Sequence, residues 1–330
     1  MKVFLNGFGR IGRTILRQLL QSDKQSEIDV VGINDIAPLE SCAYLFRYDS
    51  VFGPFQGHVE TKPSKLAING RQIAFTHAPD ISSLNLSGLD IVLECTGTAT
   101  SEDIAERGLA AGAKAVLISG PSDAAEQTVV LGANENALGT AKIVSNASCT
   151  TNAIAPLLKV LDMGLGIERG HITTIHCYTG SQPTVDAPGP SFERSRAAAV
   201  SMVPTSTSAA NQVSRILPEM SDRLSVAAVR VPCISVSAID ATFQLAELPD
   251  EPIAEFLADA FEGTGIVGTT DDPCVSTDMR GRSESLVLAL RETQLIQPRQ
   301  LRVFGWYDNE WAFSARMIEM AQRMASRAQV

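Results

Sequence analysis

One cysteine has polar neighbours of the kind that stabilise a thiolate. The stretch from Ser145 to Asn152 reads SNASCTTN, so small hydroxyl and amide side chains surround Cys149. A structural cysteine usually has apolar neighbours, whereas a reactive one needs partial exposure and groups that favour the thiolate. The apolar residues of 150–164 recur at helical spacing, which places Cys149 at or near the N-terminus of a helix. This composition predicts a reactive thiol, with a simple turn as the alternative.

His176 is the candidate partner of this thiol. It ends a predicted strand that reads TTIHCYTG. An imidazolium within hydrogen-bond reach of Cys149 would stabilise the thiolate, lower its pKa and later serve as acid and base. A lone histidine on a strand is more often a packed polar residue. The sequence alone therefore does not place His176 beside Cys149.

A glycine pattern near the N-terminus predicts a dinucleotide site. NGFGRIG supplies Gly7, Gly9 and Gly12 directly after a predicted strand, and Asp35 ends the second strand 23 residues after Gly12. The glycines permit a tight turn and close approach of a pyrophosphate, to which the following helix N-terminus offers N–H groups. A carboxylate at Asp35 can accept from both ribose hydroxyls and would repel a 2′-phosphate, which favours NAD over NADP. The alternative is a glycine-rich turn with no ligand.

The elements that must position these residues indicate two domains. Over about the first 150 residues, short β-rich runs alternate with helical stretches such as 101–113, which is the rhythm of a mostly parallel sheet. From about residue 165, long β runs at 170–179, 224–248 and 301–309 suggest a second, more antiparallel sheet. Residues 179–212 show no clear periodicity, which predicts an ordered functional loop or a linker. We therefore expect an α/β domain followed by an α+β domain.

Composition excludes several classes of function. The 330 residues are 45% hydrophobic and 19% charged with a net charge of −10, which is typical of a globular protein and argues against a nucleic-acid or membrane surface. We expect a cytoplasmic protein, because the sequence lacks both an apolar run of about 18 residues and a signal h-region. The six cysteines form no CxxC pair, so no metal is expected. Cys95 and Cys233 lie in apolar runs where core packing is the expected role.

Ten short motifs resemble one enzyme family, in the same order and across essentially the whole chain. They read NGFGRIGR, INDI, LFRYDSVFG, CTG, SNASCTTN, YTG, RSRAAA, VPTST, VRVP and GWYDNEWAFSAR. Together they resemble the phosphorylating glyceraldehyde-3-phosphate dehydrogenases of type I. The resemblance implies a Rossmann doubly wound parallel sheet over 1–148, completed by a C-terminal helix at 312–330. It also implies a catalytic α+β domain on a mixed, largely antiparallel sheet over 149–311, and usually a homotetramer.

The same resemblance implies a reaction of glycolysis with NAD as the cofactor. Cys149 would be the nucleophile and His176 its activating base. The thiolate would attack the aldehyde of glyceraldehyde 3-phosphate to give a thiohemiacetal, and hydride would pass to the nicotinamide. Inorganic phosphate would then cleave the resulting thioester to give 1,3-bisphosphoglycerate, an acyl phosphate that conserves the energy of oxidation.

The resemblance also assigns residues to binding sites. Asn309 would fix the nicotinamide carboxamide, and the loss of this contact should damage rate more than binding. Ala187 and Pro188 lie where a neighbouring subunit approaches the adenosine. The cofactor positions are Gly7, Gly9, Arg10, Ile11, Gly12, Asp35, Thr96, Gly97, Ser119 and Asn309. Thr179 and Arg230 would hold the substrate's phosphate, and the attacking phosphate would meet Ser148, Thr150, Arg194, Thr207 and Ser208.

Several positions depart from the family pattern. Ala153 replaces a second cysteine, so it offers no redox partner to Cys149. Ser181 stands where the family usually has aspartate, and Ser208 where it has a glycine. Glu193, in a segment that is basic in the family, adds a negative charge beside Arg194. These changes alter the predicted anion pockets.

Three other functions remain as alternatives. One is oxidation of a longer phosphorylated aldehyde such as erythrose 4-phosphate, as in a sister group of the family. The retained TGSQ and VPTST favour the triose enzyme. A second is a non-catalytic, NAD-binding regulatory paralogue, against which the retention of Cys149, His176, Thr179, Arg194 and Arg230 argues. A thiol hydrolase without cofactor would leave the glycine loop unexplained.

Overall fold

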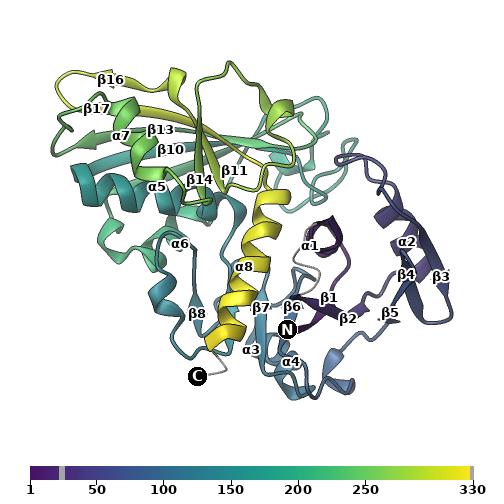
Figure 1. Ribbon diagram of the computed structural model, residues 1–330. Coiled ribbons are helices and arrows are strands. Elements are labelled where there is room, and N and C mark those ends of the chain that lie inside the picture. Colours follow the sequence, from purple (N-terminus) through teal and green to yellow (C-terminus); the bar gives the residue numbers. More distant parts are fainter. Residues whose placement is uncertain (22–26, 328–330) are drawn as a thin grey trace. The chain divides into compact units, whose positions relative to one another are not determined.

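The chain folds into two compact units (Figure 1). The computed structural model describes residues 1–21 and 27–327. The first unit comprises Met1–Val129, Glu135–Ser148 and the chain from Ser314, and the second comprises Val130–Asn134 and Cys149–Phe313. The division therefore falls between Ser148 and Cys149.

The first unit is built on a nine-stranded sheet in the order β3-β4-β5-β2-β1-β6-β7-β9-β8. All neighbours from β5 to β8 are parallel, whereas β3, β4 and β5 pair antiparallel. The strands are β1 (Lys2–Asn6), β2 (Asp29–Asn34), β3 (Val59–Lys62), β4 (Lys65–Ile68), β5 (Arg71–Thr76), β6 (Ile91–Glu94), β7 (Ala115–Ile118), β8 (Gln127–Thr128) and β9 (Ile143–Ser145). The strand order reverses at β1, which lies between β2 and β6, and such a switch point opens a crevice at the carboxyl ends. The predicted doubly wound Rossmann sheet is confirmed.

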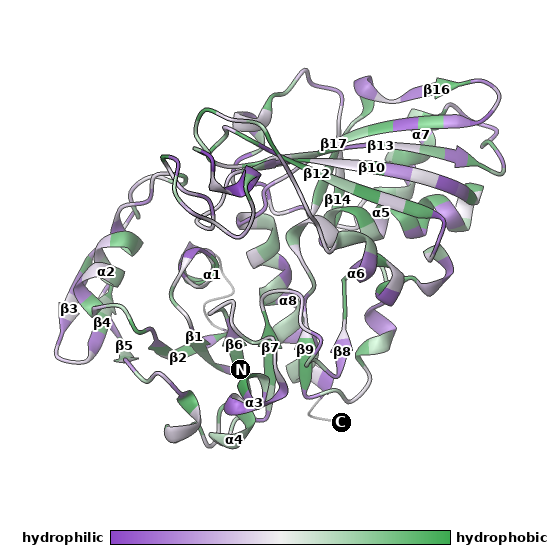
Figure 2. Cartoon of the chain, turned by 180° about the vertical axis from the view of Figure 1, so that it is seen from behind, coloured by the Kyte–Doolittle hydropathy of each residue, from purple (hydrophilic) through white to green (hydrophobic). Residues whose placement is uncertain are grey.

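Hydrophobic side chains hold this sheet between its helices. Figure 2 shows apolar residues along β6, β7 and β9, whose side chains are almost all buried. Such near-continuous apolar strands are expected where both faces of a parallel sheet are covered. The helices are α1 (Arg10–Gln21), α2 (Leu39–Arg47), α3 (Glu102–Ala105), α4 (Arg107–Ala110) and α8 (Trp311–Arg327), the last belonging to this unit from Ser314.

Two helices differ in extent from the ranges that the sequence predicts. The helix predicted over 101–113 is two short helices, α3 and α4, on either side of Glu106, which keeps helical dihedral angles of φ −79° and ψ −12°. The helix predicted over 312–330 is observed as Trp311–Arg327, and its residues 328–330 lie outside the described residues. Met317 and Met320 of this helix are fully buried, as its amphipathic pattern requires.

The second unit is built on an eight-stranded sheet in the order β11-β12-β10-β13-β17-β15-β14, with β16 paired to β17. Only β10–β12 and β14–β15 are parallel pairs, so the prediction of a mixed, largely antiparallel sheet is confirmed. The strands are β10 (Ile167–Cys177), β11 (Val203–Thr205), β12 (Leu224–Val231), β13 (Ser237–Leu245), β14 (Val267–Thr270), β15 (Leu286–Ala289), β16 (Gln294–Ile296) and β17 (Gln300–Tyr307). The helices are α5 (Cys149–Leu165), α6 (Ala209–Ile216) and α7 (Ile253–Phe261).

The β run predicted over 224–248 is interrupted. It forms β12 and β13 with an irregular segment between them, in which Val236 has a positive φ of 66° that no regular strand contains. The sequence pattern predicts no helix or strand over 179–212. In the structure this stretch contains a short 3₁₀ helix at Glu193–Ser195, β11, and the start of α6. This stretch is therefore an ordered loop rather than a linker.

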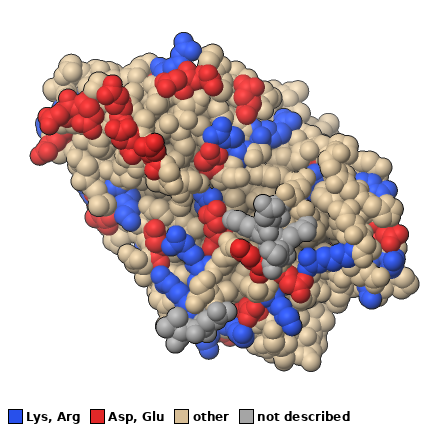
Figure 3. All heavy atoms as spheres, in the orientation of Figure 1, with Lys and Arg blue, Asp and Glu red and all other residues tan. Residues whose placement is uncertain are grey.

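Charge is distributed unevenly over the surface. On the face that Figure 3 shows, acidic side chains gather over α7 and the neighbouring strands, whereas both signs are mixed over the first unit. Within residues 1–21 and 27–327, none of the helices combines the length and the apolar character that a membrane span requires. The same residues contain no group of three or more His, Cys, Asp or Glu side chains that could hold a metal ion.

Candidate active site

The glycine loop joins β1 to α1 with little space for side chains. Gly7 has a φ of +93°, and a Cβ there would lie 2.6 Å from the backbone of Cys95 and Thr96. A Cβ on Gly12 would lie 2.2 Å from the carbonyl oxygen of Gly7. Gly9, by contrast, has nothing within 4 Å of its Cβ position. The backbone at Gly9 is thus open to close approach by a ligand, as a pyrophosphate requires.

A cavity of about 360 Å³ opens beside this loop, at the carboxyl ends of β1, β2 and β6. Gly7, Gly9, Asp35 and Thr96, all predicted to bind the cofactor, line it. The remaining lining residues are Asn6, Asn34, Ile36, Ala78, Pro79, Ile81, Glu94, Cys95, Thr98, Ile104 and Arg107. Apolar walls with a few convergent polar groups suit a nucleoside. The residues present therefore fit the adenosine portion of a dinucleotide.

Asp35 holds the glycine loop with its own carboxylate. The backbone N–H of Phe8 donates to Oδ2 at 2.6 Å, and that of Ala37 donates to Oδ1 at 2.9 Å. A carboxylate offers about four acceptor positions, so others remain for hydroxyl groups of a ligand. These two hydrogen bonds fix the Asp35 carboxylate at the cavity wall.

A buried carboxylate that the motif analysis missed lies beneath the same cavity. Glu94 is 3% exposed and accepts hydrogen bonds from Asn6 Nδ2 at 2.5 Å and from the backbone N–H of Thr96 at 2.9 Å. Asn34 Nδ2 extends this chain by donating to Asn6 Oδ1 at 2.9 Å. The network ties together the ends of β1, β2 and β6, and the glutamate at the end of the apolar run IVLE was its only signal in the sequence.

The other predicted cofactor residues lie outside the lining of this cavity. Arg10 forms an ion pair with Asp49, and Ile11 is half-buried in α1. Gly97 turns the chain with a φ of +75°. Ser119 donates its backbone N–H to the carbonyl oxygen of Glu94 at 2.9 Å. Asn309 belongs to the second unit.

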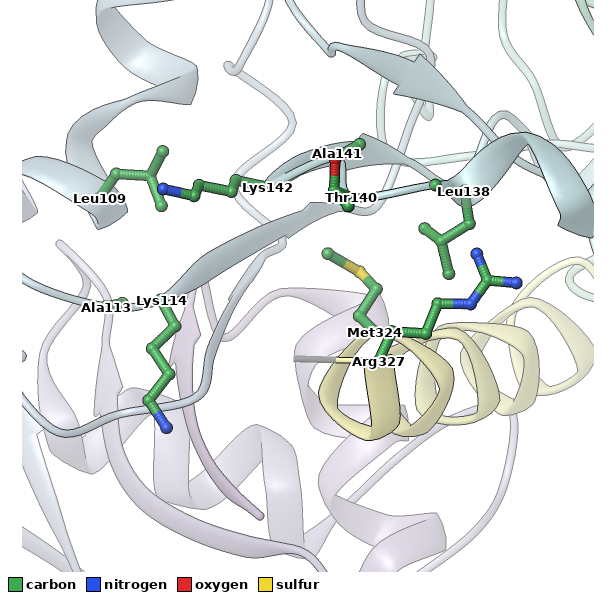
Figure 4. Close-up of a pocket in the computed structure, with 10 residues that line it drawn as sticks. Leu109, Ala113, Lys114, Leu138, Thr140, Ala141, Lys142, Met324 and Arg327 are labelled. Carbon is green, nitrogen blue, oxygen red and sulfur yellow. The ribbon is translucent and has the colours of Figure 1, made fainter. Parts of the chain in front are cut away.

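The first unit also contains a larger cavity, of about 530 Å³, that holds no predicted site residue (Figure 4). It lies between the end of α8 and the turns that precede β7 and β9. Lys142 extends along it toward Leu109, whereas Lys114 points away and pairs with Asp90 at 2.7 Å. Its charged groups do not converge on one point, so the smaller cavity beside the glycine loop is the better ligand site.

The thiol and the imidazole that the sequence singled out lie together in the second unit. Cys149 is the first residue of α5, and His176 is the penultimate residue of β10. Cys149 Sγ lies 3.6 Å from His176 Nε2, within hydrogen-bond range for sulfur. Cys149 is half-buried and His176 is 7% exposed. The positive end of the α5 dipole lies at the sulfur and favours a thiolate there.

The other ring nitrogen of His176 faces a backbone carbonyl oxygen and an arginine. His176 Nδ1 lies 2.7 Å from the carbonyl oxygen of Cys177 and 2.6 Å from Arg230 Nη1. Arg230 Nη1 also donates to the Cys177 carbonyl oxygen at 2.8 Å. The structure thus brings Cys149, His176 and Arg230 into one cluster.

The protonation of this pair differs from the prediction. Burial, more than any other effect, raises the pKa of the Cys149 thiol, and burial followed by the charge of Arg230 lowers the pKa of His176 to about 4. Both groups are therefore neutral at pH 7, because each charge alone is poorly solvated. A thiolate forms here only when the proton passes to His176 Nε2, which creates both charges together. Burial thus opposes the expected lowering of the thiol pKa by a standing imidazolium.

Tyr307 is a buried residue that organises this cluster and that residue patterns did not single out. Its hydroxyl lies 2.9 Å from Thr150 Oγ1 and 2.6 Å from Thr174 Oγ1. Its ring meets the imidazole of His176 edge-on, with 6.0 Å between the centroids. Thr150, predicted to meet phosphate, is therefore 5% exposed and directed at Tyr307. GWYDNEW, which contains Tyr307, was the signal available in the sequence.

The remaining predicted phosphate residues fall into separate places. Thr179 Oγ1 lies 3.0 Å from Ser181 Oγ, to which Arg194 Nη2 donates at 3.3 Å, so these three form one group. Thr207 and Ser208 stand at the start of α6, where Thr207 Oγ1 accepts the backbone N–H of Ala209 at 3.2 Å. Ser148 ends its segment of the first unit, next to Cys149.

The other cysteines do not all behave as the apolar patterns suggested. Cys95 and Cys233 are only partly buried, because Cys95 follows the end of β6 and Cys233 lies in the break between β12 and β13. Cys42 and Cys177 are the fully buried ones. Of these six thiols, only that of Cys149 meets an imidazole in the described part of the chain.

Comparison with known proteins agrees with this geometry. Residues 1–102 match the family "Glyceraldehyde 3-phosphate dehydrogenase, NAD binding domain", and residues 148–309 match "Glyceraldehyde 3-phosphate dehydrogenase, C-terminal domain". The chain is 46% identical to the glyceraldehyde-3-phosphate dehydrogenase of Xanthobacter flavus, with 98% of each chain covered. It is 43% identical to that of Pseudomonas aeruginosa, over 99% of this chain and 98% of the relative. This chain therefore belongs to the glyceraldehyde-3-phosphate dehydrogenase family, as an NAD-dependent oxidoreductase.

Proposed function

We propose that this protein oxidises glyceraldehyde 3-phosphate to 1,3-bisphosphoglycerate, with NAD and inorganic phosphate as co-substrates. The observation that carries the proposal is the 3.6 Å contact between Cys149 Sγ and His176 Nε2 at the N-terminus of α5. The names of the relatives, each a glyceraldehyde-3-phosphate dehydrogenase, support the same substrate.

In the first half of the reaction the aldehyde is captured by sulfur. The Cys149 proton passes to His176 Nε2 as Sγ attacks the aldehyde carbon, and the alkoxide takes that proton back to give a thiohemiacetal. NAD, when bound, supplies the acceptor for the hydride that leaves this carbon. His176 accepts the hydroxyl proton in the same step, and a thioester remains on Cys149.

In the second half phosphate releases the product. A phosphate oxygen attacks the thioester carbonyl, the carbon–sulfur bond breaks, and the departing Cys149 sulfur regains its proton from the imidazolium of His176. The neutral resting pair is thereby restored. Burial lowers the pKa of His176, so the imidazole is neutral at pH 7 and its Nε2 is available to accept the proton in the first half.

Arginine and hydroxyl groups support two anion sites. We assign the substrate's phosphate to Arg230 and the attacking phosphate to Arg194, because a guanidinium offers paired donors to an oxyanion. Arg230 lies against His176, and Arg194 shares Ser181 with Thr179. The hydroxyls of Thr179 and Ser181 would therefore serve the anion held by Arg194, whereas the family resemblance pairs Thr179 with Arg230.

Removal of the Arg194 guanidinium is expected to weaken phosphate binding. We expect Arg194→Leu to raise the KM for inorganic phosphate by about 10- to 100-fold, the equivalent of one or two charge-assisted hydrogen bonds, with a smaller effect on the KM for NAD. Arg196→Leu is the matched control, because Arg196 is in the same loop and pairs with Asp186 at 2.8 Å. Initial rates over a range of phosphate concentrations measure both variants. Equal changes in the two variants would contradict the assignment.

The choice between NAD and NADP is expected to depend on Asp35. We expect Asp35→Asn to lower the ratio of the affinity for NAD to the affinity for NADP by at least about tenfold. The change should come mainly from tighter NADP binding, because the substitution removes a charge that repels the 2′-phosphate. Calorimetric titration with each dinucleotide measures the two affinities. Asp29→Asn, at the other end of β2, should leave the ratio unchanged. An unchanged ratio in Asp35→Asn would show that another residue selects the cofactor.

A substrate comparison tests the proposed function. Purified protein with NAD should form NADH from glyceraldehyde 3-phosphate only when phosphate or arsenate is present. A higher rate with erythrose 4-phosphate than with glyceraldehyde 3-phosphate would show that the tetrose phosphate is the preferred substrate. If the protein bound NAD but oxidised neither aldehyde, the regulatory, non-catalytic alternative would be the one supported.

A further inference from the structure

The residue after the base, Cys177, contacts several functional groups at once. Its carbonyl oxygen lies 2.7 Å from His176 Nδ1 and accepts from Arg230 Nη1 at 2.8 Å. Its thiol donates to Asn309 Oδ1 at 3.1 Å. Cys177 is 1% exposed, so these contacts are shielded from water. The mechanism proposed above gives the thiol no task.

The strands explain how one residue reaches in two directions. Side chains alternate along β10, so His176 and Cys177 leave the strand on opposite sides. The imidazole of His176 meets Cys149, whereas the thiol of Cys177 meets Asn309, which follows β17. The backbone N–H of Cys177 donates to Ser237 Oγ at 3.2 Å, which anchors the residue to the start of β13.

We propose that Cys177 is a positioning residue that fixes the orientation of the Asn309 amide and thereby the recognition of the nicotinamide carboxamide. This inference rests on the assignment of Asn309 to that carboxamide. A thiol donates one proton, and its bond to Oδ1 turns the planar amide so that Nδ2 points away from Cys177. Nδ2 is then the donor that meets the carboxamide oxygen.

Burial keeps this thiol in the donor state. It raises the pKa of Cys177 to about 12, and the nearby Cys149 and Glu310 add to the shift. At neutral pH the sulfur therefore carries its proton, which it donates to Asn309 Oδ1. If residue 177 offered no hydrogen-bond donor, the two orientations of the Asn309 amide would differ less in energy. Either Oδ1 or Nδ2 would then face the ligand.

The test uses dinucleotide binding alone, so it does not depend on the aldehyde, on phosphate or on turnover. The probes are NAD, the NAD analogue with sulfur in place of the carboxamide oxygen, and the analogue with an acetyl group in place of the carboxamide. We expect the wild-type protein to bind NAD at least about tenfold more tightly than the sulfur analogue, because sulfur is a poor acceptor. The acetyl analogue, which keeps the oxygen, should bind within about threefold of NAD.

The variants separate orientation from packing. Cys177→Ala should reduce the preference for NAD over the sulfur analogue to about threefold or less, whereas Cys177→Ser, which keeps a donor, should retain it. In an Asn309→Ala background, Cys177→Ala should cause no further change, as expected when one residue acts through the other. Cys42→Ala removes a buried thiol from the first unit and should leave the preference intact.

Three results would overturn the inference. The first is a preference that survives in Cys177→Ala, and the second is its loss in Cys177→Ser as well as in Cys177→Ala. The third is discrimination by the wild-type protein against the acetyl analogue alone, which would mean that Oδ1 rather than Nδ2 faces the carboxamide. None of these depends on the proposed reaction, which the turnover assay tests separately.

Discussion

Cys149→Ser is expected to lower kcat for NAD-dependent aldehyde oxidation by about 10⁴-fold or more, with the Kd for NAD changed by less than about twofold. Serine has nearly the same shape but a far weaker acid at the reacting atom. His176, whose pKa is about 4, is too weak a base to compensate. An ester on serine would also resist cleavage by phosphate more than a thioester does. Steady-state rates with glyceraldehyde 3-phosphate and calorimetry with NAD measure the two quantities.

Another partly buried cysteine of the same unit provides the control for this variant. Cys274→Ser should keep kcat within about twofold of the wild type, because this thiol packs against Val236, Met279 and Val287 and makes no contact with Cys149 or His176 in the described part of the chain. If Cys149→Ser retained more than about one hundredth of the activity, the account of covalent catalysis would be wrong.

His176→Asn is expected to have the second-largest effect, a loss of about 10³-fold in kcat. Asparagine occupies similar space but cannot accept the Cys149 proton or return it when phosphate cleaves the thioester. His171→Asn is the matched control, because His171 lies on the same strand, is exposed, and contacts Ser225 Oγ at 2.7 Å. Equal losses of kcat in both variants would show that the substitutions act by disturbing β10 and not by removing a catalytic base.

The same variant has a distinct dependence on pH. In the wild-type protein, the pair carries one shared proton between the low pKa of His176, about 4, and the raised pKa of Cys149. The fraction with the proton on nitrogen is constant over that range, so alkylation of Cys149 by iodoacetamide should be flat from about pH 5 to about pH 8. The rate of alkylation should fall below that range, where His176 becomes an imidazolium and can no longer accept the proton of Cys149.

Without His176 the thiolate forms only by simple titration of a thiol whose pKa is raised. Alkylation of His176→Asn should therefore increase about tenfold per pH unit over the same range. Peptide mapping after brief labelling confirms that Cys149 is the residue modified. A flat profile in the variant, or a tenfold rise per unit in the wild-type protein, would mean that the two groups do not share a proton.

The fold and the position of the Cys149 thiol could be predicted because local patterns specify them. The glycine loop follows a strand and begins a helix, and only a few backbone paths satisfy Gly7 and Gly12 together. The apolar spacing after Cys149 fixed the start of α5. These signals lie within short stretches of sequence, where the periodicity of strands and helices is decisive.

Contacts between distant segments could not be predicted in this way. Tyr307 meets Thr150 across 157 positions of sequence, and Cys177 meets Asn309 across 132. Such pairs depend on the order of strands in the second sheet, in which β10, β13 and β17 are neighbours. No spacing rule encodes that order. Glu94 was missed for the same reason, because a single glutamate in a strand does not reveal which side chains will satisfy it.

The protonation of the active-site pair was missed for a different reason. Residue types indicate which charges could attract each other, but not how far water is excluded from them. Burial is the largest effect on both Cys149 and His176, and it opposes the attraction between a thiolate and an imidazolium. Only the packing of Tyr307 and its neighbours around the pair reveals this balance.

Single turnover without phosphate tests the central claim most directly. Enzyme is mixed rapidly with NAD and glyceraldehyde 3-phosphate in phosphate-free buffer, NADH is followed by absorbance, and the quenched protein is mapped by mass spectrometry. The account predicts a burst of about one NADH per subunit, an acyl group on Cys149, and its release as an acyl phosphate when phosphate is added. Continued NADH formation without phosphate, or an acyl group on any other residue, would contradict it.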